Sequence, residues 1–138
     1  MPNREPRLVI IEHDVETARV MAYELNILGV DVLATYADVE QARRGAPWSR
    51  ATACYLDYRL GDEQDDLLTW LRQEYPYVIR ILATAYANGG LPAQAVGAAD
   101  TVFRKPFSIS ALYGAIISPP SVDVLHEIEL HEGLGGSR

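Results

Sequence analysis

Cysteine is almost absent from this sequence, which has a single thiol at Cys54. One cysteine cannot form a disulfide within a chain, so we expect the reducing environment of the cytoplasm. Long apolar runs are also absent, because none approaches the roughly 20 residues that a membrane-spanning helix needs. Residues 1–7 lack the apolar core of a signal peptide. We therefore expect neither a membrane span nor a secretory leader.

Positive charge is in short supply as well. Twelve Lys and Arg residues face 19 Asp and Glu residues, which gives a formal net charge of -7. This balance argues against direct binding to nucleic acid or to an anionic membrane surface. The sequence has no internal repeat, and its 138 residues suit one domain with one core.

Five short apolar runs alternate with helical patterns. They predict strands over residues 8–12, 30–35, 52–57, 77–84 and 100–105. Helices are predicted to begin near residues 15, 38, 65, 93 and 108. This alternation is typical of an α/β fold with a parallel sheet, helices on both faces and right-handed crossovers.

Capping residues and apolar stripes mark the first and last helices. We expect Asp14 to cap the first helix and Gly29 to stop it, and Ser108 to cap the last. The predicted stripes are Val20, Met21, Leu25 and Leu28 on the first helix, and Ile109, Leu112, Ile116 and Ile117 on the last.

Polar and charged residues stand at the ends of four of the five predicted strands. They are Glu12 with His13, Asp57, Thr84 and Lys105, whereas the strand ending near Thr35 adds no comparable group. Parallel strands bring their carboxyl ends to one edge of a sheet, where open α/β sheets bind ligands. We therefore expect these side chains to lie close together.

This set of residues suits phosphoryl chemistry. Carboxylates hold Mg²⁺ through hard oxygen ligands, and Asp57 can attack a phosphoryl group to give an acyl phosphate. The Lys105 ammonium can neutralise phosphoryl oxygens, and the Thr84 hydroxyl can donate a hydrogen bond. Each residue alone also fits an ordinary role in a turn, cap or strand. Their joint occurrence at four strand ends favours a site.

The sequence resembles the receiver domain of two-component response regulators. The resemblance covers roughly residues 7–118 and rests on four segments. They are Leu8-Val-Ile-Ile-Glu-His-Asp14, Tyr55-Leu-Asp-Tyr-Arg-Leu60, Leu82-Ala-Thr-Ala85, and Gly97-Ala-Ala-Asp100 through Arg104-Lys-Pro-Phe107. It implies a flavodoxin-like, doubly wound sheet of five parallel strands in the order 2-1-3-4-5, with five helices.

The resemblance also implies roles. Asp57 would accept a phosphoryl group from a histidine kinase or phosphotransfer protein, and the chain would signal by altered binding to a downstream partner. Thr84 would be the switch hydroxyl and Lys105 the phosphate-contacting lysine. Mg²⁺ would be held by Asp57, the acidic pair after the first strand and the Arg59 backbone carbonyl. Members of the family often pair, so a homodimer is one state to consider.

The acidic pair is incomplete here, because His13 follows Glu12 where the family normally has a second acid. Imidazole is a poorer Mg²⁺ ligand than a carboxylate, and it repels the metal when protonated. We expect Mg²⁺ binding to survive with weakened affinity. The alternative is a pseudo-receiver that takes no phosphoryl group and acts as an interaction module.

Two further departures concern switching and phosphate lifetime. Val102 stands where many members have an aromatic residue that changes rotamer, so the readout surface switches differently or Val102 merely packs as a strand residue. Arg59 and Tyr86 lie two residues beyond Asp57 and Thr84, where the resemblance places the path of the attacking water. Their bulk predicts slow self-dephosphorylation, and we expect no other enzyme activity from a phosphoacceptor domain.

Competing enzymes on this fold lack support in the sequence. No Gly-rich phosphate loop follows the first strand, and no second carboxylate stands two residues past Asp57, as an aspartate-nucleophile phosphatase would require. We expect a receiver domain over residues 1–118 and a short tail over 119–138, part helix and then flexible. That tail is too short for an output domain.

Overall fold

Five parallel strands form the centre of the molecule. The computed structural model describes residues 5–59, 65–85 and 93–117. The strands are β1 (Arg7–Ile11), β2 (Asp31–Tyr36), β3 (Ala53–Tyr58), β4 (Ile79–Thr84) and β5 (Thr101–Arg104). They pair in the order β2-β1-β3-β4-β5, with every neighbouring pair parallel. This confirms the flavodoxin-like fold class that the resemblance implied.

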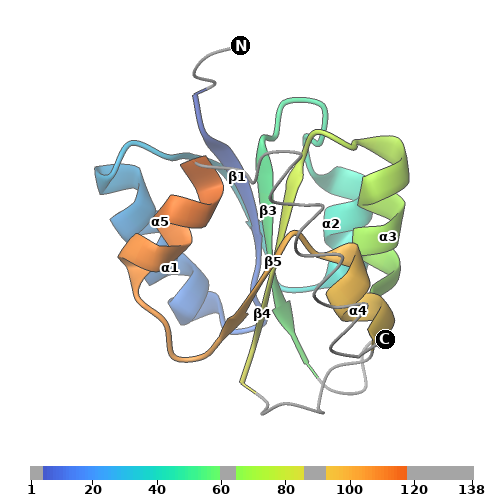
Figure 1. Ribbon diagram of the computed structural model, residues 1–138. Helices are drawn as coiled ribbons and strands as arrows, with labels where there is room; N and C mark the ends of the chain where they lie inside the picture. Colours follow the sequence, from blue (N-terminus) through green and yellow to red (C-terminus); the bar gives the residue numbers. More distant parts are fainter. Residues whose placement is uncertain (1–4, 60–64, 86–92, 118–138) are drawn as a thin grey trace.

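Helices cover both faces of the sheet (Figure 1). They are α1 (Val15–Ile27), α2 (Val39–Gly45), α3 (Asp65–Glu74), α4 (Ala93–Ala98) and α5 (Ile109–Ile117). Helices α1 and α5 lie on one face, and α2, α3 and α4 on the other. All six residues of β3 and all six of β4 are buried, because both faces of these strands are covered.

The core therefore has two layers, one on each side of the sheet. Leu56 and Leu82 point into the layer under α2, α3 and α4, which also holds Trp48 and Leu68. Tyr55 and Ile81 point the other way, into the layer under α1 and α5. This alternation follows from the two-residue period of a strand. No helix within the described ranges is long and apolar enough to cross a bilayer.

The predicted caps of α1 and α5 are present. The Asp14 side chain accepts a hydrogen bond from the Glu16 amide at 3.1 Å and another from the Thr17 hydroxyl at 2.9 Å. Gly29 follows the helix with a φ of 98°, a left-handed conformation that favours glycine. The Ser108 hydroxyl accepts from the Ala111 amide at 3.0 Å at the start of α5.

The predicted apolar stripes are correct only in part. On α1, Met21 and Leu25 are buried together with Ala18, but Val20 and Leu28 are exposed. The buried side of this helix follows residues 18, 21 and 25. Val20 precedes Met21 by one residue and is therefore rotated away from this side. On α5, Leu112 and Ile116 are buried and Ile117 is exposed for the same reason. The predicted tail over residues 119–138 lies outside the described residues.

Candidate functional site

The predicted strand-end residues meet at one edge of the sheet. Leu56 pairs with Ile11 across the β1–β3 ladder, so the next residue on each strand, Asp57 and Glu12, are neighbours. Thr84 is the last residue of β4 and pairs with Arg104. The Lys105 amide then donates a hydrogen bond to the Thr84 carbonyl at 2.7 Å, which carries the β4–β5 pairing one residue further. The register of the sheet thus assembles the set.

Lys105 joins the two acids. Its Nζ lies 2.6 Å from Oδ1 of Asp57 and 3.5 Å from Oε1 of Glu12. Both carboxylates are almost completely buried, whereas the lysine side chain is 28% exposed. Two buried acids therefore share one cation that still reaches solvent. Such an arrangement is electrostatically demanding, because each acid loses much of its hydration on burial.

The effect of burial and of the neighbouring charges is clearest in the pKa of Glu12. Burial raises its pKa above the ordinary value, and the hydrogen bond from the Asp14 amide, at 3.2 Å, opposes that rise. The negative charge of Asp57 raises the pKa further, and the positive charge of Lys105 lowers it. A cation placed between the two carboxylates would relieve the same repulsion.

Oxygen ligands for a divalent cation are therefore present. Glu12 and Asp57 reach one ammonium group, so they lie close enough to share one small cation. Mg²⁺ keeps several waters and commonly binds through one or two carboxylates, which fits this pair. Among the described residues, no group of three or more His, Cys, Asp or Glu side chains gathers as a metal site.

His13 has an exposed side chain in the turn between β1 and α1. It does not form a group of three with Glu12 and Asp57 in this conformation. Arg59 follows β3 directly and is also exposed. The metal-ligand roles of His13 and of the Arg59 carbonyl stay predictions. Tyr86, the other bulky residue expected near the phosphate, lies outside the described residues.

Val102 does not pack into the core. It is a residue of β5, pairs with Leu82 across the β4–β5 ladder and is 39% exposed, so it packs as a strand residue at the edge of the sheet. The neighbouring Phe103 points to the opposite face, where its ring lies 5.1 Å from that of Phe107 in the layer under α1 and α5. Phe103 therefore does not replace the missing aromatic residue beside Thr84.

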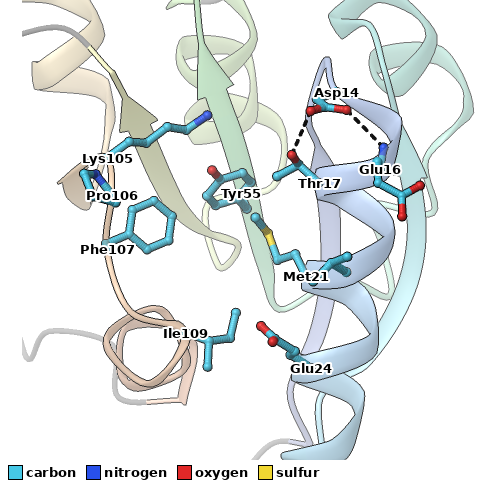
Figure 2. Close-up of a pocket in the computed structure, with 11 residues that line it drawn as sticks. Asp14, Glu16, Thr17, Met21, Glu24, Tyr55, Lys105, Pro106, Phe107 and Ile109 are labelled. Atoms are coloured by element: carbon cyan, nitrogen blue, oxygen red, sulfur yellow. Dashed lines mark hydrogen bonds between the residues drawn. The ribbon is translucent and has the colours of Figure 1, made fainter.

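A groove of about 540 Å³ opens next to the acids, between α1 and the segment that joins β5 to α5 (Figure 2). Lys105 and Asp14 line its end nearest the acids, and Met21, Phe107 and Ile109 form apolar walls. The sequence analysis did not identify this groove. It forms only when residues from α1, β3 and the β5–α5 segment come together, and no local pattern signals that.

Tyr55 also lines this groove, and the sequence analysis gave it no role. It stands two residues before Asp57 on β3, so both side chains leave the same face of the sheet. That spacing is the one sequence signal for its place beside the acids. In Figure 2 its ring stands between Lys105 and α1.

Cys54 is not a candidate nucleophile. It is completely buried in β3, and burial raises the pKa of its thiol to about 12. A thiol that stays protonated at neutral pH and has no access to solvent is inert.

The comparisons with known proteins found similar structures but no similar sequence family. No family model matches the sequence, and no curated protein matches it. Solved structures do match. The receiver domain protein (CheY-like) from Methanospirillum hungatei JF-1 has a TM-score of 0.70 at 22% identity, over 93% of this chain and 99% of that one.

Two further structures agree. A response regulator from Burkholderia pseudomallei has a TM-score of 0.69 at 22% identity, over 95% of this chain and 75% of that one. The receiver domain of the putative response regulator NarL from Mycobacterium tuberculosis has a TM-score of 0.71 at 17% identity, over 82% and 94%. The fold of this chain is that of a response regulator receiver domain.

Proposed function

We propose that this chain is a phosphoryl-accepting receiver domain and that Asp57 is the acceptor. One observation carries the proposal: Asp57 stands at the carboxyl end of the central strand, within 2.6 Å of the Lys105 ammonium and beside a second buried acid. The fold supports it, because the Burkholderia pseudomallei regulator with the same fold contains a phosphorylated aspartic acid.

In the proposed reaction a carboxylate oxygen of Asp57 attacks the phosphorus of a phosphohistidine. The new O–P bond forms as the P–N bond breaks, and the imidazole leaves with its electron pair and takes a proton from solvent. The products are an acyl phosphate on Asp57 and a neutral histidine on the donor. The donor is a histidine kinase or a phosphotransfer protein.

Residues around Asp57 have separate tasks in this reaction. Lys105 exchanges its contact with the carboxylate for one with a phosphoryl oxygen, and its charge offsets the charge that develops there. The Thr84 hydroxyl turns toward another phosphoryl oxygen, and this turn reports the modification to the surface that a downstream partner binds. Glu12, Asp57 and the Arg59 carbonyl would hold Mg²⁺, and the ion would supply further charge neutralisation.

Intact-protein mass after incubation with acetyl phosphate tests this proposal. With Mg²⁺ present, we expect an adduct of one phosphoryl group that is lost in Asp57→Asn. The matched control is Asp31→Asn, which changes an exposed aspartate at the start of β2 and should keep the adduct. Without Mg²⁺ the adduct should be much weaker.

A specific observation favours a second function, an interaction module that is never phosphorylated. His13 is exposed and adds no third ligand to Glu12 and Asp57. If neither acetyl phosphate nor a phosphohistidine donor gives an adduct with Mg²⁺ or Mn²⁺, the phosphoacceptor role is wrong. The protein would then bind its partners through a surface that is never changed by phosphorylation.

A further inference from the structure

The hydroxyl of Tyr55 needs an explanation. Tyr55 is completely buried, and its hydroxyl oxygen has no hydrogen-bond partner among the described residues. Leaving a buried hydroxyl unpaired costs free energy, and phenylalanine would fill the same space without that cost. Native structures usually satisfy such groups, so an exception points to a state in which a partner is available.

The surroundings of this hydroxyl limit what the partner can be. On the helix side the ring packs against apolar groups, with the Phe107 ring 6.2 Å away and Met21 in the same cluster. Toward the strand ends it meets the negative charges of Glu12 and Asp57. Burial and these two charges raise the pKa of Tyr55 far above its ordinary value. A tyrosine hydroxyl is protonated at neutral pH even at its ordinary pKa, so this one is a donor beside two acceptors.

Glu12 is the acceptor with the weaker present contacts. Lys105 lies 3.5 Å from Oε1 of Glu12, at the limit of a hydrogen bond, but 2.6 Å from Asp57. The other oxygen of Glu12 accepts a hydrogen bond from the Asp14 amide, at 3.2 Å. If Lys105 moves to a phosphoryl group on Asp57, Glu12 gives up its contact with this ammonium group while it stays buried.

We propose that Tyr55 is a positioning residue that donates its hydroxyl hydrogen bond to the Glu12 carboxylate when Asp57 carries a phosphoryl group. This bond replaces the contact that Lys105 gives up and keeps the Glu12 carboxylate aimed at the cation. The inference rests on the proposed function, and it assigns the groove-lining tyrosine to the loaded state of the same site. The two groups already adjoin, because the Glu12 carboxylate is one of the groups that raise the pKa of Tyr55.

The test compares Tyr55→Phe with the unaltered full chain by thermal unfolding. Without ligands the variant should be as stable or more stable, because it lacks an unpaired hydroxyl. With Mg²⁺ and beryllofluoride, a mimic of the phosphoryl group, the rise in Tm should be smaller in the variant. The Mg²⁺ concentration that gives half of the rise should increase about tenfold, as expected for one lost hydrogen bond to a charged group.

Two controls separate positioning from packing. Tyr113→Phe removes another hydroxyl from the layer under α1 and α5 and should leave the Mg²⁺ dependence unchanged. In a Glu12→Ala background, Tyr55→Phe should no longer alter the Mg²⁺ dependence, because the acceptor of the Tyr55 hydroxyl is gone.

The possible results distinguish failure of the positioning role of Tyr55 from failure of the proposed function. If the unaltered chain responds to Mg²⁺ and beryllofluoride and Tyr55→Phe responds equally, the positioning role is wrong and the proposed function stands. If Tyr55→Phe shifts the Tm equally without ligands and with Mg²⁺ and beryllofluoride, the hydroxyl affects only the stability of the fold, and the positioning role is wrong. If the unaltered chain shows no response at all, the proposed function fails and the inference fails with it.

Discussion

At the scale of single residues, the site is a competition for one ammonium group. Asp57 holds Lys105 closely and Glu12 holds it at the limit of contact, although Glu12 is the more deeply buried acid. A buried carboxylate that is only partly compensated is poised to accept a cation. This incomplete compensation is one reason why we propose that a cation binds at the site.

The raised pKa of Glu12 gives a prediction for the metal-free protein. Because the folded state holds this proton more tightly than the unfolded state, the stabilising contribution is complete below pH 4.5 and is lost as the pH rises through the folded pKa. Each unit of the rise corresponds to about 1.4 kcal/mol. The free energy of unfolding relative to that of Glu12→Gln should therefore fall as the pH increases from 4.5 toward neutrality.

Urea unfolding at several pH values without divalent cations measures this difference. Glu24→Gln, which changes an exposed acid on α1, should give a flat difference over the same range. Parallel curves for the unaltered chain and Glu12→Gln would show that burial does not perturb Glu12.

At the scale of elements, the strand that precedes Lys105 is short, and an ion pair lies beside its start. The Arg80 guanidinium lies 3.3 Å from Oδ1 of Asp100, and the Arg80 amide donates to Oδ2 at 2.7 Å. Arg80 also donates to the Ala98 carbonyl at the end of α4, at 2.8 Å. These contacts fasten the α4–β5 connection to β4. They fix where β5 starts, and therefore where Lys105 emerges.

Replacing Asp100 by alanine should destabilise the protein substantially. The change leaves the nearly buried Arg80 guanidinium without its carboxylate partner and removes the acceptor of the Arg80 amide. We therefore expect the free energy of unfolding to fall by roughly 3 kcal/mol. Glu40→Ala removes the partner of Arg43 in an exposed pair at 3.9 Å and should cost little. Denaturant unfolding compares the two, and similar losses would mean that the Arg80–Asp100 pair is only a surface contact.

At the scale of the whole molecule, one sheet serves two cores. The strands β3 and β4 contribute side chains to both layers, so neither layer can come apart while the other keeps its strands. The proposed site lies at the edge where these strands end. A change of packing in either layer can therefore reach it.

This architecture predicts a single unfolding transition. Both tryptophans, Trp48 and Trp70, belong to the layer under α2, α3 and α4, with ring centroids 6.3 Å apart. Leu112→Ala opens a cavity in the opposite layer and should cost about 2–5 kcal/mol. Tryptophan fluorescence should show the full decrease in the free energy of unfolding, although both tryptophans lie in the other layer. The urea midpoint measured by fluorescence should equal the midpoint measured by far-ultraviolet circular dichroism. Separate midpoints would reveal two independent layers.

Much of this protein could be predicted from local sequence. Asp14, Gly29 and Ser108 mark helix ends, because capping is decided by a few neighbouring residues. The apolar runs predict the strands, and the order of elements favours a parallel sheet whose strand ends gather Glu12, Asp57, Thr84 and Lys105. That convergence needs only the direction of the strands, which the alternation of elements implies.

The tertiary structure alone decided what depends on distance and burial. It placed Lys105 closer to Asp57 than to Glu12 and left Val20 and Val102 exposed. It also buried the Tyr55 hydroxyl without a hydrogen-bond partner in the part of the chain that the structure describes. These outcomes arise from the packing of segments far apart in the chain. Secondary structure is set by neighbours in sequence, but electrostatic balance and cavity shape are set by neighbours in space, which only the folded chain brings together.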